Sequence, residues 1–312
     1  MVRQMKRPSP ATSRLAVMAG LILFASAGAV AQDSGLPPPG APPARSSRDV
    51  REHEWGQAMF IQYLAASNPW PGERVQEFVN RLGQNLARAS GSAHIFTFRV
   101  VHSPEPNARA FPGGFVVVHS GAVGLAGSEA ELASVLAHEI AHVNARHWQR
   151  RQKRAVWLGL LTVVPLMFGA SPLAMTVSYG SLAASPLEQA RFSRSFEKEA
   201  DRLALVYLAR AGYDPEAALT LFEKYRDLRG QRGGGANGLL ASHSPLAKRA
   251  RHIEQSLGRI SMPSLALETT SEFESVREEV LAGERDLAVK ARQRSTDPSP
   301  APPKLLRRRA TD

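Results

Sequence analysis

The pentad His138-Glu139-Ile140-Ala141-His142, an HExxH pattern, restricts the fold of this 312-residue chain more than any other feature. The preceding segment Ser128-Glu129-Ala130-Glu131 matches a capping box, and apolar residues recur at helical spacing between 132 and 143. On a helix the two histidines lie one turn apart on the same face, so both can bind one zinc ion. Glu139 lies beside them, where it can accept a proton from water held at the metal. The pentad therefore predicts a zinc hydrolase built around this helix.

The first 31 residues have the pattern of a secretory signal peptide. Basic residues precede an apolar run from Leu15 to Val30, and Ala29-Val30-Ala31 is a small-x-small cleavage site. An uncleaved membrane anchor is the alternative interpretation. The chain has no cysteine, so an exported form would depend on its core and its metal rather than on disulfides. We expect a periplasmic protein, with membrane association as a further option.

The chain is basic, with a formal net charge of +11 that falls to +7 without the four positive charges of the predicted signal. Such a charge favours an anionic membrane surface or a soluble basic surface. No nucleic-acid-binding motif is visible, so nucleic acid is not an expected partner. We expect a Pro-rich linker over 32–48, one catalytic domain over 49–293 and a disordered basic tail over 294–312.

The hydrophobic pattern predicts an α+β fold, mostly helical, with a small β-sheet beside the HExxH helix. Helices are expected over 49–66, 73–90, 129–150, 186–211, 214–229, 245–257 and 272–293, and strands over 94–101, 115–119 and 264–268. Pro112-Gly113-Gly114 is a predicted turn before the strand Phe115–His119. We expect that strand to be an exposed edge that pairs with an extended substrate.

Residues 155–187 carry no charge and follow a basic cluster at 150–154. The apolar run is broken by prolines and glycines before it reaches the ~20 residues that a membrane span needs. A full span is therefore the weaker alternative. We expect a buried or lid-like segment, with peripheral membrane contact through 150–184.

A catalytic zinc site needs a third protein ligand, and the segment Glu197-Lys198-Glu199-Ala200-Asp201 offers one. Glu197 and Asp201 share a helix face, whereas Glu199 points about 200° away from Glu197. One of the two carboxylates can bind zinc while the other orients a ligand histidine. Spacing alone does not decide between this arrangement and an ordinary solvated face.

Three segments in this order, NARAFPGG (107–114), HEIAH (138–142) and EKEAD (197–201), resemble the gluzincin metallopeptidase family of the HtpX heat-shock protease and the CAAX prenyl endoprotease. Within it the chain is most similar to the periplasmic branch typified by BepA and LoiP. The resemblance covers residues 50–285 and implies a zincin-like domain. One sequence difference is Arg109, which stands where the family usually has an aromatic residue.

The resemblance also implies roles for individual residues. The metal ligands would be His138, His142 and Glu197, with one Zn²⁺ per chain, Glu139 as the catalytic base and Asp201 behind the ligands. Glu139 would assist the attack of zinc-bound water on peptide bonds of unfolded or misassembled envelope proteins.

His243 follows a glycine-rich stretch, and related enzymes have a histidine there that can occupy the open position of the metal and keep the enzyme latent. Stabilisation of the reaction's oxyanion and an ordinary loop histidine are the alternatives. His147 lies about 140° round an unbroken helix from His142 and is poorly placed to bind zinc.

Two other functions remain open. One is a membrane-integral protease that uses both apolar segments as spans. The other is a membrane-associated chaperone or assembly factor with a silenced peptidase site.

Overall fold

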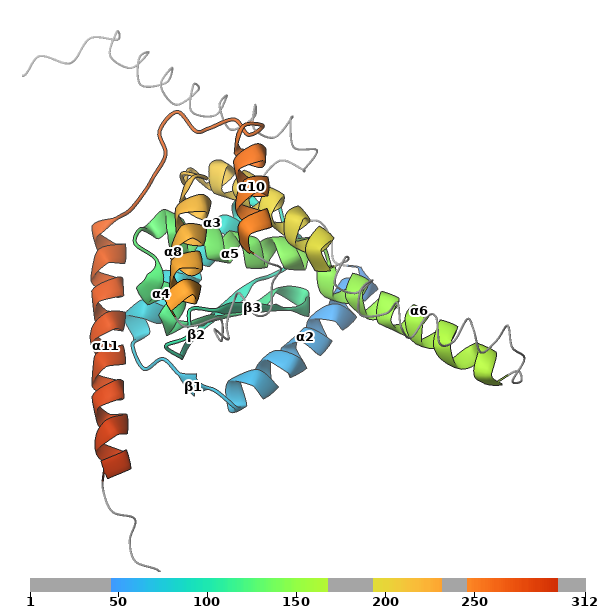
Figure 1. The fold of residues 1–312 in the computed structure, drawn as a ribbon, viewed down its shortest axis with the longest axis horizontal. Helices are drawn as coiled ribbons and strands as arrows, with labels where there is room; N and C mark the ends of the chain where they lie inside the picture. The colour runs from blue at the N-terminus through green and yellow to red at the C-terminus, as the bar shows by residue number, and fades with distance from the viewer. Residues whose placement is uncertain (1–45, 168–192, 232–245, 297–312) are drawn as a thin grey trace, which may run out of the picture.

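The computed structural model describes residues 46–167, 193–231 and 246–296. Helices pack on both faces of a four-stranded sheet (Figure 1). On one face lies α2 (Ser47–Ala65), which begins with a capping box between Ser46 and Asp49. On the other face lie α3 (Glu73–Ala89) and α5 (Glu129–Asn144), which both contribute buried side chains to the main core. The predicted mostly helical α+β fold is thereby confirmed.

The sheet has the order β1-β2-β4-β3. Its strands are β1 (Asn68–Pro69), β2 (Thr97–His102), β3 (Ala108–Phe111) and β4 (Phe115–His119). β2 pairs with β4 in parallel, and β3 pairs with β4 antiparallel. The expectation that Phe115–His119 forms an exposed edge is wrong. β4 is an inner strand whose five residues are all buried, and the edge strand beside it is β3.

Every side chain of β4 is buried because both of its faces are covered. Val116 and Val118 point into the core with α3 and α5, while Phe115 and Val117 point into a second core. That second core includes Phe60 of α2. Burial on both faces explains why the strand is a continuous apolar run rather than an alternating one.

The turn between β3 and β4 is the 3₁₀ segment η1 (Pro112–Gly114), as the sequence predicts a turn there. Gly113 has φ +76°, and a Cβ at this position would lie 2.4 Å from the Cα of His53 in α2. Likewise, a Cβ on Gly56 would lie 1.7 Å from the carbonyl oxygen of Pro112. The glycines therefore let α2 and η1 pack backbone against backbone.

The predicted helix over 129–150 is in fact two helices, so that prediction is wrong at its C-terminal end. α5 ends at Asn144, and α6 (His147–Met167) starts in a new direction. Between them Arg146 has φ +52°, and within the described part it is the one non-glycine residue with positive φ. Its guanidinium forms ion pairs with Asp49 and Glu52 of α2, the latter over 2.9 Å. These ion pairs stabilise a backbone conformation that arginine rarely adopts.

The remaining helices follow the predicted order. A helix over 193–211 ends before Gly212 (φ +83°) and is followed by α8 (Ala217–Gln231), α10 (Leu246–Leu257) and α11 (Ser271–Thr296). The predicted strand over 264–268 is wrong, since only a single bridge joins Leu267 to Tyr213.

Several predicted features lie outside the described residues: the signal peptide, most of the linker, the helix start at Pro186, the glycine-rich stretch, His243 and most of the tail. Among the helices that are described, none has the length and apolar character needed to span a membrane.

Candidate metal centre

Three potential metal ligands meet between α5 and the helix over 193–211. His138 and His142 point from one face of α5, and Glu197 faces them from the second helix. The Nε2 atoms of the histidines lie 3.0 Å apart. The Glu197 carboxylate oxygens lie 3.5 Å from His138 Nε2 and 3.7 Å from His142 Nε2.

This donor set fits a zinc ion. Zinc bonds of about 2.0–2.1 Å at tetrahedral angles place ligand atoms about 3.3 Å from one another. The three observed separations lie on either side of that value, and two imidazole nitrogens with one carboxylate leave a fourth position open. Glu197 and His138 are buried, as expected for ligands held by the core.

Asp201 and Arg249 support the buried side of the centre. Asp201 Oδ1 lies 3.1 Å from His138 Nδ1, on the opposite side of the imidazole ring from the ligand atom. Arg249 of α10 pairs with Asp201 and also lies 3.3 Å from Glu197 Oε2. Burial would lower the pKa of His138, but the hydrogen bonds that its ring donates to Asp201 and Glu197 raise it to about 9. Burial would raise the pKa of Asp201, but the Arg249 charge holds it below its usual range.

A second chain of contacts supports His142. His147, the first residue of α6, places its Nδ1 2.9 Å from Nδ1 of His142, and its Nε2 lies 3.3 Å from a Glu199 oxygen. Burial lowers the pKa of His147 to about 4, because the effect of burial is larger than the opposite effect of the Glu199 carboxylate. A neutral His147 can therefore accept a hydrogen bond at Nδ1 from the Nδ1–H of His142 and donate one from its Nε2–H to Glu199. This arrangement leaves His142 Nε2 available to bind a metal.

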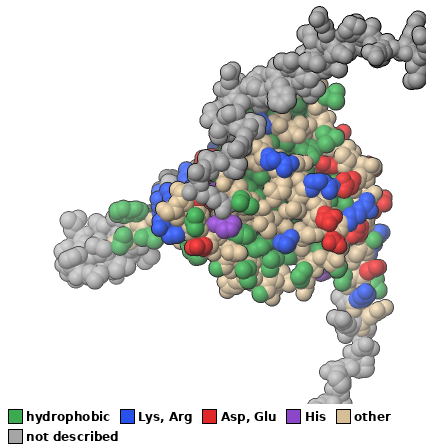
Figure 2. Space-filling model, turned by 180° about the vertical axis from the view of Figure 1, so that it is seen from behind, with side chains coloured by type: hydrophobic (Ala, Val, Ile, Leu, Met, Phe, Trp, Pro, Cys, Tyr) green, Lys and Arg blue, Asp and Glu red, His purple; other side chains and the backbone are tan. Residues whose placement is uncertain are grey.

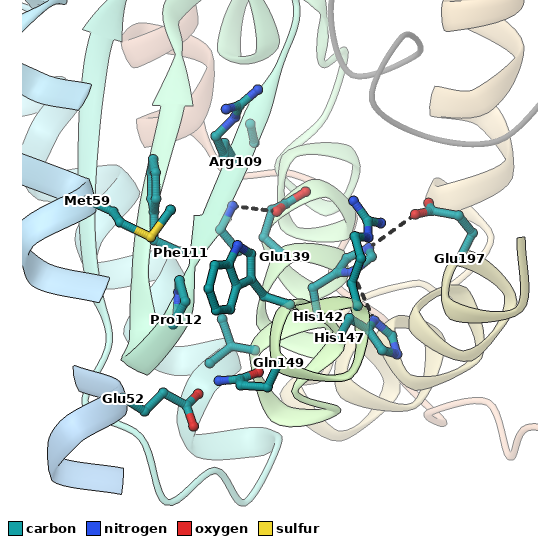
Figure 3. A pocket seen from close by; sticks show the side chains of 15 residues that line it. Glu52, Met59, Arg109, Phe111, Pro112, Glu139, His142, His147, Gln149 and Glu197 are labelled. Carbon is teal, nitrogen blue, oxygen red and sulfur yellow. Dashed lines mark hydrogen bonds and ion pairs between the residues drawn. The ribbon is translucent and has the colours of Figure 1, made fainter. Parts of the chain in front are cut away.

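Glu139 joins the centre to the edge of the sheet. The amide N–H of Ala110 in β3 donates to its Oε2 over 2.8 Å (Figure 3). Glu139 follows His138 directly on α5, and its side chain lies between β3 and the histidines. The carboxylate thus lies where an extended chain along β3 would approach a metal.

A cavity of about 290 Å³ opens over this centre. Its lining includes Glu139, His142 and Glu197 on one side and β3 on the other. Arg109 of β3 also lines it, with its guanidinium 5.6 Å from the centre of the Tyr63 ring.

The structure thus brings together the sequence-predicted residues His138, Glu139, His142, Glu197 and Asp201, while His243 lies outside the described part of the chain. Sequence reasoning missed Arg249 and the pair formed by His147 and Glu199. One signal was available for Arg249: it precedes the buried Ile253 by four residues and so shares the apolar face of α10.

Comparisons with known proteins agree with this geometry. Residues 69–257 match the model of peptidase family M48. The chain is 33% identical over 235 residues to the beta-barrel assembly-enhancing protease of Escherichia coli (strain K12), covering 73% of this chain and 47% of that protein. It is 37% identical over 157 residues to the mitochondrial metalloendopeptidase OMA1 of Arabidopsis thaliana, covering 50% of this chain and 30% of that protein. The matches span about half or less of the length of these relatives.

Proposed function

This chain belongs to peptidase family M48, and from that premise we propose that it is an exported, zinc-dependent endopeptidase that cleaves unfolded or misassembled envelope proteins. The observation that carries the proposal is the position of Glu139. Its carboxylate lies between the His138–His142–Glu197 cluster and β3, the strand at one edge of the described sheet. A metal ligand set, a base and a strand edge meet at one cavity, which is the arrangement that peptide hydrolysis needs.

Under this proposal β3 aligns the substrate. An extended peptide would pair with the open edge through backbone hydrogen bonds, so binding would depend little on side chains. The strand Phe115–His119, which the sequence suggested for this role, supports β3 from the inside instead. Low side-chain selectivity suits a protease that acts on unfolded chains.

His138, His142 and Glu197 would hold the zinc ion, with Asp201 orienting His138. The ion would supply the Lewis acidity that polarises a peptide carbonyl and acidifies water. Glu139 would accept a proton from the attacking water and return it to the leaving amine. The cavity walls from β3 and α6 would limit the access of bulk water.

The substrate class and the location rest on sequence and on relatives. The name of the Escherichia coli relative refers to assembly of beta-barrels, and the N-terminal pattern predicts export. We further propose that His243 keeps the enzyme latent; the glycine-rich sequence before it supports this role. The described part of the range expected to contact a membrane, 150–167, lies in α6.

The test compares cleavage of casein by the zinc-loaded protein with cleavage by Glu139→Gln. We expect Glu139→Gln to keep one zinc per chain and to lose activity by about 10²–10⁴-fold, as when a general base is removed. Glu77→Gln is the matched control, because Glu77 is exposed on α3, away from the cavity. His243→Ala should cleave faster than wild type if His243 is inhibitory.

If Glu139→Gln cleaves as fast as wild type, the assigned base is wrong. If the wild type and every variant bind zinc one to one and none of them cleaves casein, the alternative function is favoured. That alternative is a membrane-associated assembly factor with a silenced peptidase site.

A further inference from the structure

The first half of α6 projects away from the body of the protein (Figure 1). Its base is held by Trp148, which packs edge-on against Trp55 of α2 with ring centres 4.0 Å apart. Beyond this contact most of the described side chains of α6 are exposed. The helix therefore presents a surface that the described core does not use.

Large apolar side chains occupy that surface. Val156, Trp157 and Leu160 are 61%, 66% and 45% exposed. Their spacing of one and four residues places them on one face of the helix. Single exposed apolar residues are common, but three on one helix face, including a tryptophan, mark a contact surface.

Basic residues lie next to this apolar face. Lys153 precedes Val156 and Trp157 by three and four residues, so it shares their face, and it is exposed. Arg150 lies on the same face but is engaged, since it binds Glu199 over 2.7 Å and stacks on Phe196. No Asp or Glu occurs in α6 (His147–Met167). Figure 2 shows the blue and green side chains side by side where this helix leaves the body.

We propose that α6 docks the protein on the surface of an anionic lipid bilayer through Lys153, Val156, Trp157 and Leu160. Basic residues bind anionic headgroups, and tryptophan favours the interface between headgroups and acyl chains. An apolar face of this kind is buried at that boundary while the helix lies in the membrane plane.

An anionic bilayer fits this surface better than a protein partner does. The surface combines the positive charge of Lys153 with large exposed apolar side chains on a helix that projects from the body, which matches the charged headgroups and the apolar interior of such a bilayer. Docking by α6 requires no peptidase chemistry, so its test is independent of the proposed function.

The experiment measures binding of the purified protein to phosphatidylcholine vesicles with and without phosphatidylglycerol, by co-sedimentation. We expect binding only to the anionic vesicles. Lys153→Glu changes the charge by two units and should weaken binding about 25-fold, at about fivefold per charge. Trp157→Ser should weaken it about tenfold through lost apolar burial.

The matched controls are Lys290→Glu and Val289→Ser on α11, exposed residues on the opposite side of the fold from α6. They should bind like wild type. The vesicle-induced blue shift of tryptophan emission should disappear in Trp157→Phe, which keeps an apolar ring. Equal binding to neutral and anionic vesicles, no binding to either, or wild-type binding by Lys153→Glu and Trp157→Ser would each overturn the proposal.

Discussion

Arg249 donates to both carboxylate oxygens of Asp201, from Nη2 over 2.6 Å and from Nε over 3.0 Å, and both side chains are buried. This two-pronged pair lies directly behind His138, whose ring is held by the same carboxylate. A buried arginine thus balances the negative charge that Glu197 and Asp201 bring into the core.

Replacing Arg249 by Gln should lower the free energy of unfolding by about 3–5 kcal/mol, because two buried carboxylates lose their cation. Urea unfolding of the metal-free protein measures this. Arg249→Lys keeps the charge but loses the bidentate geometry, so its free energy of unfolding should lie between those of wild type and Arg249→Gln. A loss below about 1 kcal/mol for Arg249→Gln would show that solvent already screens the pair.

Removal of His147 should weaken zinc binding rather than activity alone. His147→Ala frees the Nδ1 side of His142, and loss of such an outer contact typically costs 10–100-fold in metal affinity. Competition against a chromophoric zinc chelator gives the affinity. His252→Ala on α10 is the control and should bind zinc like wild type. Equal affinities for all three proteins would contradict the proposed orientation of His142.

Substitution by alanine should destabilise the protein to different extents at two glycines with similar φ angles. Gly212 has φ +83°, and a Cβ added to it would meet no atom within 4 Å, so Gly212→Ala should cost about 1–2 kcal/mol of conformational strain. Gly113→Ala adds a collision with the His53 backbone and should lower the melting temperature by a clearly larger amount. Thermal unfolding followed by circular dichroism compares them. Equal melting temperatures would mean that α2 can move off the turn at little cost.

His119 should make the protein less stable in mild acid. Burial lowers its pKa from 6.5, so the folded state resists protonation more than the unfolded state does. Stability from this group is complete above pH 6.5 and is lost as the pH falls from there towards the lower folded pKa. His119→Gln should flatten this part of a plot of unfolding free energy against pH. An unchanged slope would assign the acid sensitivity to other groups.

Arg109 should favour acidic substrates. Arg109 lies on the edge strand β3 and lines the cavity together with Glu139 and His142. Arg109→Ser should lower kcat/KM about fivefold or less for peptides with an acidic residue near the cleaved bond, since the charge is exposed. Neutral peptides, measured in parallel, should change little. A similar loss for both peptide classes would indicate a role in alignment instead.

The parts of the fold encoded by local patterns were predictable. The capped helix from Glu129 and the strand Phe115–His119 appear with their predicted starts, because caps and apolar runs act locally. The sequence analysis missed β3 because its four residues, one of them an exposed arginine, are too few to show the alternation of apolar and polar side chains that marks a strand. Which strand lies at the edge depends on pairing between distant segments, and no local pattern encodes it.

The candidate site was predictable where it follows helical spacing and not where tertiary contacts decide. The helical spacing of the pentad was enough to predict that His138 and His142 share a face and that Glu139 lies beside them. His147 was placed by assuming an unbroken helix, yet the chain turns at Arg146 without glycine or proline, held by acidic residues of α2. Arg249 resembles Arg251 in sequence and differs from it in being buried.

The turn at Arg146 couples two parts of the molecule. His142 lies in the last turn of α5, and His147 is the first residue of α6. The 2.9 Å contact between their Nδ1 atoms therefore crosses the bend between the two helices. A change in the angle of α6 therefore alters the outer contact of a predicted metal ligand. A ligand that favours one angle of α6 would therefore change the affinity of the protein for metal. By thermodynamic reciprocity, metal binding would change the affinity for that ligand by the same factor.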